Sequence, residues 1–197
     1  MNPNAATLRL AAFPRAGLLT DALLVVGGAG LVAAAAQVEI GLGFTPVPIT
    51  GQTFAVLLVG AALGSVRGFL SLALYLAVGL LGAPVYQEGN QGWDYFAGAT
   101  GGYLIGFLIA ATAAGFLAEL RWDRRLSSAI AAMLTGNVII YAIGLPWLAN
   151  ELGTGLEKTL ELGLYPFVIG DVLKLYLAAA LLPAAWRLID PATGRRP

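Results

Sequence analysis

The sequence contains neither cysteine nor histidine in its 197 residues. Without cysteine the chain forms no disulfide and offers no thiolate to a metal ion. Without histidine it has no HExxH zinc site, no serine–histidine catalytic pair and no histidine proton relay. We therefore expect no metal site, no catalytic residues of these kinds and no cofactor.

Charge is also scarce, because only 11% of the residues are charged and the formal net charge is zero. Nucleic-acid binding normally requires a cluster of basic residues, and no such cluster is present, so we expect no nucleic-acid partner. The only lysines are Lys158 and Lys174, and no GxxxxGK[ST] motif occurs. The chain therefore carries no P-loop ATPase of its own.

Apolar residues, in contrast, make up 58% of the chain. Average soluble domains carry about 25% charged residues, and a soluble core of this size has no room for so much apolar surface. A bilayer removes the difficulty, because it is itself an apolar solvent. The composition therefore predicts an integral membrane protein.

Six apolar runs approach the ~20 residues that span a bilayer as a helix. They predict an all-α fold, an integral membrane bundle of six transmembrane helices that forms a single transmembrane domain over residues 1–197. The expected helices cover approximately residues 18–40, 51–63, 68–81, 100–118, 126–148 and 165–188. The second run is the shortest of the six.

The distribution of basic residues predicts the orientation, because cytoplasmic loops are enriched in lysine and arginine. An even number of helices with both termini in the cytoplasm leaves only Lys158 in an outer connection, with Lys174 inside a helix. The inner segments then hold all the arginines, which are Arg9, Arg15, Arg67, Arg121, Arg124, Arg125, Arg187, Arg195 and Arg196. The longer connections lie outside, where we expect a binding site.

The strongest polar signal lies in the last apolar run, where Asp171 and Lys174 are three residues apart and so share a helix face. Asp171 lies roughly 8 Å below the outer helix end, at about 1.5 Å per residue. A charge at that depth is costly and usually faces the bundle interior. The pair is either an ion pair that only holds the fold together or a recognition pair for a ligand with adjacent N–H and C=O groups.

Two further stretches are candidates for a ligand site. Pro46 and Pro48 stiffen an extended connection that ends in Thr50 and Gln52, which is either a rigid connector or a lid whose polar side chains bind a ligand. Tyr103, at a glycine-rich helix start, combines an apolar ring with a polar tip. Asn137 and Tyr141 are four apart on the fifth helix and either face the same cavity or bond to another helix.

Small residues on the first helix point to close packing. Ala29 and Ala33 are four apart, and such pairs let helix backbones approach closely in a membrane. This face either packs within the bundle or docks on another membrane protein. The four tryptophans, Trp93, Trp122, Trp147 and Trp186, fall near the predicted membrane interfaces and are expected to act as aromatic belt anchors.

Four motifs in one order resemble the BioY family, the substrate-binding (S) components of energy-coupling factor transporters for biotin. The motifs are Pro46–Thr53, Leu80–Val85, Gly98–Gly106 and Tyr165–Lys174, and the resemblance covers roughly residues 18–188. It implies a high-affinity biotin-binding subunit, not an enzyme, in the plasma membrane of a prokaryote. It also implies partners: a transmembrane coupling protein, reached through Ala29 and Ala33, and two cytoplasmic ATPase subunits.

By the same resemblance, Asp171 and Lys174 contact the ureido ring of biotin. The family pattern also implies a basic residue for the biotin carboxylate in the outer connection after the third helix, but Gly82–Gly98 contains none. Backbone N–H groups or the side chains of Gln87, Asn90 and Gln52 are the alternatives.

Other functions are weighed against this one. An S component for another vitamin, such as thiamine or riboflavin, is the main alternative. Intramembrane proteases of the serine or aspartyl type need a histidine or two deep aspartates, and only Asp171 lies deep. A channel needs a ring of charges or a carbonyl filter, which a lone Asp171–Lys174 pair does not provide.

Overall fold

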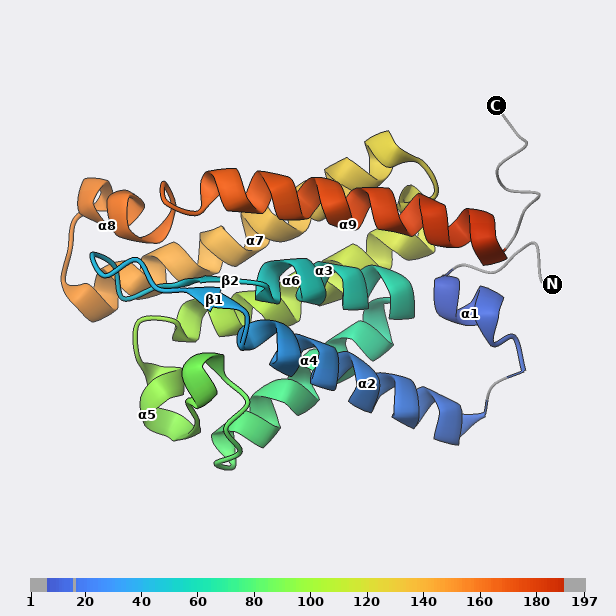
Figure 1. Cartoon of the computed structure of the whole chain (residues 1–197), viewed down its shortest axis with the longest axis horizontal. Coiled ribbons are helices and arrows are strands. Elements are labelled where there is room, and N and C mark those ends of the chain that lie inside the picture. Colours follow the sequence, from blue (N-terminus) through green and yellow to red (C-terminus); the bar gives the residue numbers. More distant parts are fainter. Residues whose placement is uncertain (1–6, 16, 190–197) are drawn as a thin grey trace.

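The computed structural model describes residues 7–15 and 17–189. Figure 1 shows a bundle of helices with one small hairpin. In chain order the elements are α1 (Leu8–Ala12), α2 (Leu18–Ala36), β1 (Glu39–Ile40), β2 (Ile49–Thr50), α3 (Gln52–Leu63), α4 (Ser65–Leu80), η1 (Gln87–Gly89), α5 (Gly92–Ala97), α6 (Gly101–Glu119), η2 (Trp122–Arg124), α7 (Leu126–Leu152), α8 (Leu156–Gly163) and α9 (Val168–Ile189).

The six apolar runs of the sequence all form helices. Within the described residues, α2, α6, α7 and α9 are long and apolar enough to cross a membrane, whereas α3 and α4 are shorter apolar helices of 12 and 16 residues. The protein is therefore a mostly helical protein with helices of membrane-spanning length. A count of six crossings, the single domain and the cytoplasmic termini stay predictions, and Arg195 and Arg196 lie outside the described residues.

Two helix ends differ from the prediction by four residues, and the other boundaries differ by at most three. The first helix was expected to reach residue 40 but ends at Ala36, because the chain turns into the β1–β2 hairpin, in which Glu39 pairs with Thr50. The fifth was expected to end at 148 but continues through Pro146 to Leu152. It stops at Gly153, whose φ of 62° is the left-handed conformation that caps helices.

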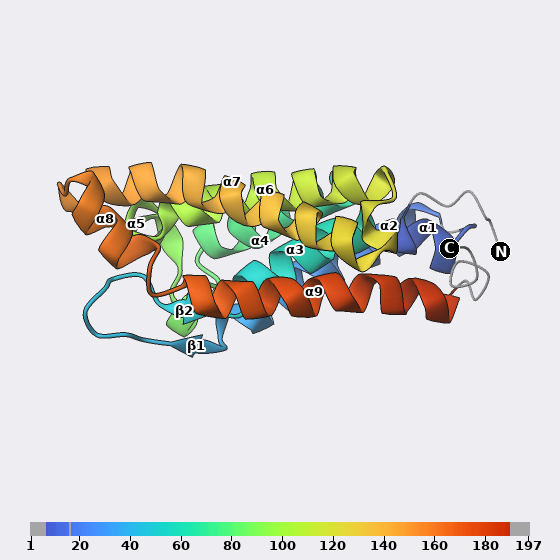
Figure 2. The same ribbon diagram turned by 90° about the horizontal axis from the view of Figure 1, so that it is seen from above.

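The short elements were not predicted, because none has the length of a membrane span. They lie at the two ends of the bundle (Figures 1 and 2). The hairpin, α5 and α8 gather at one end, called the hairpin end here. At the other end, called the arginine end, α1 and η2 lie near the last turns of α9.

The centre of the bundle is α6, which packs against α3, α4 and α7. In its most apolar stretch 61% of the residues are buried, compared with 11% in α2, which lies at the edge.

Contact between α3 and α6 is backbone to backbone: a Cβ on Gly60 would lie 2.2 Å from the carbonyl oxygen of Ala111. Gly64, with φ of 89°, then turns the chain from α3 into α4. The short helices therefore depend on glycine at their crossing points.

Charged side chains tie the arginine end together. The Asp21 carboxylate on α2 accepts hydrogen bonds from Arg9 of α1 and, at 2.8 Å, from Arg67 of α4. On the opposite side, Asp123 of η2 is buried and accepts a hydrogen bond of 2.5 Å from the Trp186 indole N–H of α9. The guanidinium of Arg124 stacks 3.5 Å from the centre of the same indole ring.

The tryptophans do not all act as interface anchors. Trp186 is only 2% exposed and is bonded to Asp123, so the belt prediction is wrong for this residue. Trp147 is partly buried and donates its indole N–H to the Gly98 carbonyl, at 2.9 Å. Trp93 and Trp122 are exposed, as an interfacial position requires. Trp147 and Trp186 therefore form contacts inside the protein, which their positions in the sequence did not reveal.

Burial gives Asp123 a pH-dependent role in stability. It raises the pKa of the carboxyl from 3.8 to about 6, although the Trp186 N–H and Arg124 act in the opposite direction. The folded protein holds this proton more tightly than the unfolded chain, so the contribution to stability is fully present below pH 3.8 and is lost as the pH rises to about 6. The loss is on the order of 2–3 kcal/mol, at 1.36 kcal/mol per pKa unit.

We expect Asp123→Asn to remove this dependence, because the amide keeps an oxygen for Trp186 but does not ionise. Thermal unfolding in detergent, followed at several pH values from about 4 to about 7, checks this. As the pH rises through this range, the melting temperature of the native protein should fall relative to that of Asp123→Asn. Parallel profiles for the two proteins would show that the buried carboxyl does not control stability.

Candidate functional site

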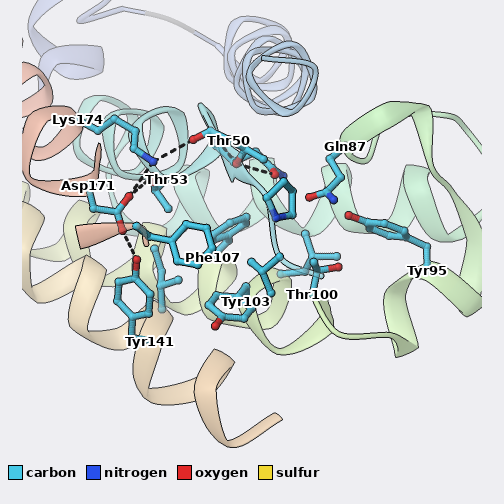
Figure 3. Close-up of a pocket in the computed structure, with 16 residues that line it drawn as sticks. Thr50, Thr53, Gln87, Tyr95, Thr100, Tyr103, Phe107, Tyr141, Asp171 and Lys174 are labelled. Atoms are coloured by element: carbon cyan, nitrogen blue, oxygen red, sulfur yellow. Dashed lines mark hydrogen bonds and ion pairs between the residues drawn. The ribbon is translucent and has the colours of Figure 1, made fainter. Parts of the chain in front are cut away.

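A pocket opens near the hairpin end and is enclosed by α3, α6, α7, α9 and the hairpin (Figure 3). Most of its wall is apolar, formed by Val47, Pro48, Tyr103, Leu104, Phe107, Ile140 and Phe167. Polar side chains gather at two places within it. Small-molecule sites commonly combine an apolar lining with a few placed polar groups.

One polar group is centred on Asp171 and Lys174 of α9, which face the pocket as their spacing predicted (Figure 3). Lys174 Nζ lies 2.7 Å from Asp171 Oδ1 and donates to the Thr50 carbonyl at 3.0 Å. The second oxygen of Asp171 accepts the Tyr141 hydroxyl, and Thr53 donates to Oδ1 at 3.3 Å. The partners of the pair thus come from three other elements, β2, α3 and α7, which fix its orientation.

The pair keeps unused hydrogen-bonding capacity. A carboxylate has about four lone-pair sites, and an ammonium group has three donors. Asp171 accepts from three side chains, and Lys174 donates to two acceptors. Within the described residues, this leaves one acceptor site of Asp171 and one donor of Lys174 without a protein partner. A neutral group with adjacent N–H and C=O satisfies both at once.

A second network stiffens the end of the hairpin. The Thr50 hydroxyl donates to Gln52 Oε1 at 3.1 Å, and Gln52 Nε2 donates to the Tyr75 hydroxyl at 2.9 Å. Gln52 and Tyr75 are both buried. Gln52 lines the pocket, but both ends of its side-chain amide are engaged with the protein. Gln52 is therefore placed to support Thr50 rather than to contact a ligand directly.

The other polar group lies across the pocket, beyond Phe107, and consists of Gln87, Tyr95 and Thr100 (Figure 3). Burial raises the pKa of the Tyr95 hydroxyl to about 12, so it remains a hydrogen-bond donor at neutral pH. Gln87 is 9% exposed, and its side-chain amide adds two N–H donors. This end of the pocket therefore offers neutral donors to an acceptor group.

The structure brings six of the predicted ligand-site residues to the pocket, namely Asp171, Lys174, Tyr103, Thr50, Gln52 and Gln87. Asn90 and Asn137 do not line it. The Asn90 amide donates to the Gln87 backbone carbonyl at 3.0 Å and so shapes the η1 turn. Asn137 is buried one helical turn from Tyr141, and its Oδ1 has no hydrogen-bond partner within the described ranges. Their contact with a ligand stays a prediction.

The predicted docking residues lie partly inside the bundle. Ala29 is 8% exposed, and Ala33 is partly buried and packs against the core. Both therefore contribute to packing within the described part of the chain. Their contact with a partner protein stays a prediction.

Several lining residues were not singled out from the sequence. Phe107 follows Tyr103 by four residues, and Phe167 precedes Asp171 by four, so helical periodicity was a usable signal for both. Tyr95 carried no such signal, and Thr53 belonged to the Pro46–Thr53 motif without being assigned to the site. Tyr95 comes from the short helix α5, and Thr53 reaches Asp171 across 118 residues of sequence.

The chain is similar to known proteins in both sequence and structure. The family model described as "BioY family" matches residues 4–191. A protein of Rhizobium etli named "Biotin transporter BioY" is 37% identical over 149 residues, covering 72% of this chain and 79% of the relative. One of Thermotoga maritima with the same name is 37% identical over 167 residues, covering 85% and 90%.

A solved structure is also similar. It is described as the S-component for biotin from an ECF-type ABC transporter, and it superposes with a TM-score of 0.76 at 27% identity. The match covers 84% of this chain and 90% of that one. The family model spans nearly all the described helices, and relatives above 30% identity cover most of the chain. This chain belongs to the BioY family.

Proposed function

We propose that this protein is the biotin-binding subunit of a vitamin uptake transporter, which captures biotin with high affinity and catalyses no reaction itself. The observation that carries the proposal is the buried Asp171–Lys174 pair, set in an apolar pocket with neutral donors at the opposite end. Biotin has a ureido ring, an apolar fused ring and chain, and a terminal carboxylate, in that order. The names of the relatives point to the same ligand.

In this arrangement the ureido ring meets the α9 pair. Its N–H donates to the free acceptor site of Asp171, and its carbonyl accepts from the remaining Lys174 N–H. The ring system and chain pack along Phe107 and the neighbouring apolar wall. The carboxylate then reaches Gln87, with Tyr95 as an additional donor. Gln87 is favoured over Asn90, which does not line the pocket, and over Gln52, whose amide already bonds to Thr50 and Tyr75.

We further propose that the hairpin end faces the outside and that α2, α3, α4, α6, α7 and α9 all cross the plasma membrane of a prokaryote. The short helices α3 and α4 reach only about 18 and 24 Å, at 1.5 Å per residue. The hairpin and the η1 loop fill the remaining depth above them, next to the pocket (Figure 1). By the family resemblance, a coupling protein with two ATPase subunits drives delivery to the cytoplasm, a division of labour that fits a chain with no P-loop motif of its own.

The proposal is tested by binding radiolabelled biotin to the purified protein in detergent. We expect saturable binding that unlabelled biotin displaces and that thiamine and riboflavin leave unchanged. The reason is that a cationic thiamine ring has no favourable position next to Lys174. If the protein is folded and a different vitamin displaces the label, the family assignment stands but the ligand is wrong.

A further inference from the structure

The short helix α8 ends beside the pocket, and its last carbonyl groups have no partner within the helix, as at every helix end. Two of them accept hydrogen bonds from side chains of distant segments. The Leu162 carbonyl accepts the Thr45 hydroxyl at 2.7 Å, and the Gly163 carbonyl accepts the Tyr103 hydroxyl at 2.9 Å. The end of α8 therefore connects the hairpin to the wall of the pocket.

Thr45 occupies a central position in the hairpin connection. Its hydroxyl donates to α8 and also accepts the Val47 backbone N–H at 3.2 Å. This second bond curves the chain so that Val47, only 7% exposed, and Pro48 lie against the pocket. Pro46 and Pro48 restrict the backbone on either side of Val47, so the segment from Thr45 to Pro48 is stiff.

The hairpin is held over the pocket at two points. At its base, Lys174 donates to the Thr50 carbonyl, and β1 and β2 pair over only two residues each. Near its tip, the Thr45 contact with α8 spans 117 residues of sequence. The base contact involves a residue that also meets the ligand, whereas the tip contact does not. The two points therefore have separable effects on ligand binding.

We propose that Thr45 is a positioning residue that keeps the hairpin closed over the bound ligand, with the carboxyl end of α8 as its latch. This inference rests on the proposed function, because it assigns Thr45 to the retention of biotin in the same pocket. Tyr103 holds α8 in place from the pocket side through the neighbouring carbonyl. Movement of the hairpin away from the pocket breaks the Thr45–Leu162 bond.

The test compares Thr45→Val, which removes the hydroxyl at nearly constant shape, with Thr45→Ser, which keeps it. Dissociation of radiolabelled biotin is followed after addition of excess unlabelled biotin. We expect biotin to dissociate roughly two- to tenfold faster from Thr45→Val, with an unchanged association rate, because the hydroxyl's bonds to the Leu162 carbonyl and the Val47 N–H are both lost. Thr45→Ser should behave like the native protein.

A second measurement needs no ligand. The chain has no cysteine, so Phe44→Cys and Lys158→Cys take spin labels at two exposed positions, one on the hairpin and one on α8. The distance distribution between the labels should be narrow with Thr45 or serine and broader with valine. If the native protein does not bind biotin, the proposed function fails, and the distances still test the latch.

An unbroadened distribution in Thr45→Val overturns the latch. A broadened distribution with an unchanged dissociation rate overturns its role in retaining biotin. Thermal unfolding of each variant confirms that the protein remains folded.

Discussion

Replacing Asp171 by asparagine and Lys174 by alanine together is expected to weaken biotin binding at least about 100-fold. In the proposed arrangement each residue supplies one charge-assisted hydrogen bond to the ureido ring, and such bonds contribute about 1.5–3 kcal/mol each. The double variant replaces the Asp171 carboxylate by a neutral amide and removes the Lys174 ammonium group. Equilibrium binding of radiolabelled biotin to the purified variant measures the effect.

The chain offers a matched control for this experiment. Lys158 and Glu161 form a second ion pair with the same spacing of three residues, at 2.7 Å, on the exposed surface of α8. Replacing them by alanine and glutamine removes the same two charges away from the pocket and should leave the affinity unchanged. Exposed pairs of this kind contribute only about 0–1 kcal/mol.

The experiment also separates recognition from structural support. If Asp171 and Lys174 only hold α3, α7 and α9 together, the double variant loses thermal stability but binds biotin with the native affinity. Buried charge pairs are often neutral or unfavourable for stability, so a large stability effect is not expected when both partners are removed. An affinity within about threefold of the native value would contradict the proposed role of the pair.

Gly60→Ala is expected to destabilise the protein by on the order of 3 kcal/mol, the upper range for overpacking a tight interface. A Cβ at this position would lie 2.2 Å from the Ala111 carbonyl oxygen and 2.8 Å from its Cα, both of which are backbone atoms of α6. A side chain in that position has no rotamer to relieve the clash, so α3 must move away from the central helix. The melting temperature in detergent measures the loss.

Gly30→Ala is the matched control, since this glycine lies on the exposed face of α2 and a Cβ there meets no atom within 4 Å. The same change of side chain should leave stability unchanged or raise it slightly, because alanine favours the helix over glycine by about 1 kcal/mol. Equal melting temperatures for the two variants would show that the α3–α6 crossing tolerates a wider separation. Reduced biotin binding by Gly60→Ala would follow from the displacement of Thr53, which α3 carries into the pocket.

Much of the site was visible in the sequence because its signals are local. Asp171 and Lys174 are one helical turn apart within an apolar run, so periodicity alone placed both on one face. The prolines at 46 and 48 likewise predicted a stiff connection, and Val47 and Pro48 do line the pocket. Helix ends were less accurate, because the hairpin after Ala36 and the left-handed Gly153 depend on contacts that a hydropathy pattern does not contain.

The positions of other residues relative to the pocket could not be predicted from local sequence patterns. Tyr95 reaches the pocket from α5, a helix of six residues that carries no periodic signal. Asn90 and Asn137 were plausible as polar residues near the expected cavity, yet one bonds to its own turn and the other lies one helical turn from the pocket residue Tyr141. Trp186 lies at the predicted membrane interface in sequence but turns inward to Asp123.

The sequence by itself determined that the chain forms membrane-length helices and that an acid and an amine share one face of the last helix. Apolar content and helical period belong to a continuous stretch of chain, so they can be read without knowing the fold. Only the tertiary structure decided which polar groups meet that pair and what closes over it. Thr53 and Asp171 are 118 residues apart, and Thr45 and Leu162 are 117 apart. These contacts exist because α3 packs against α9, and because α8 ends where the hairpin passes.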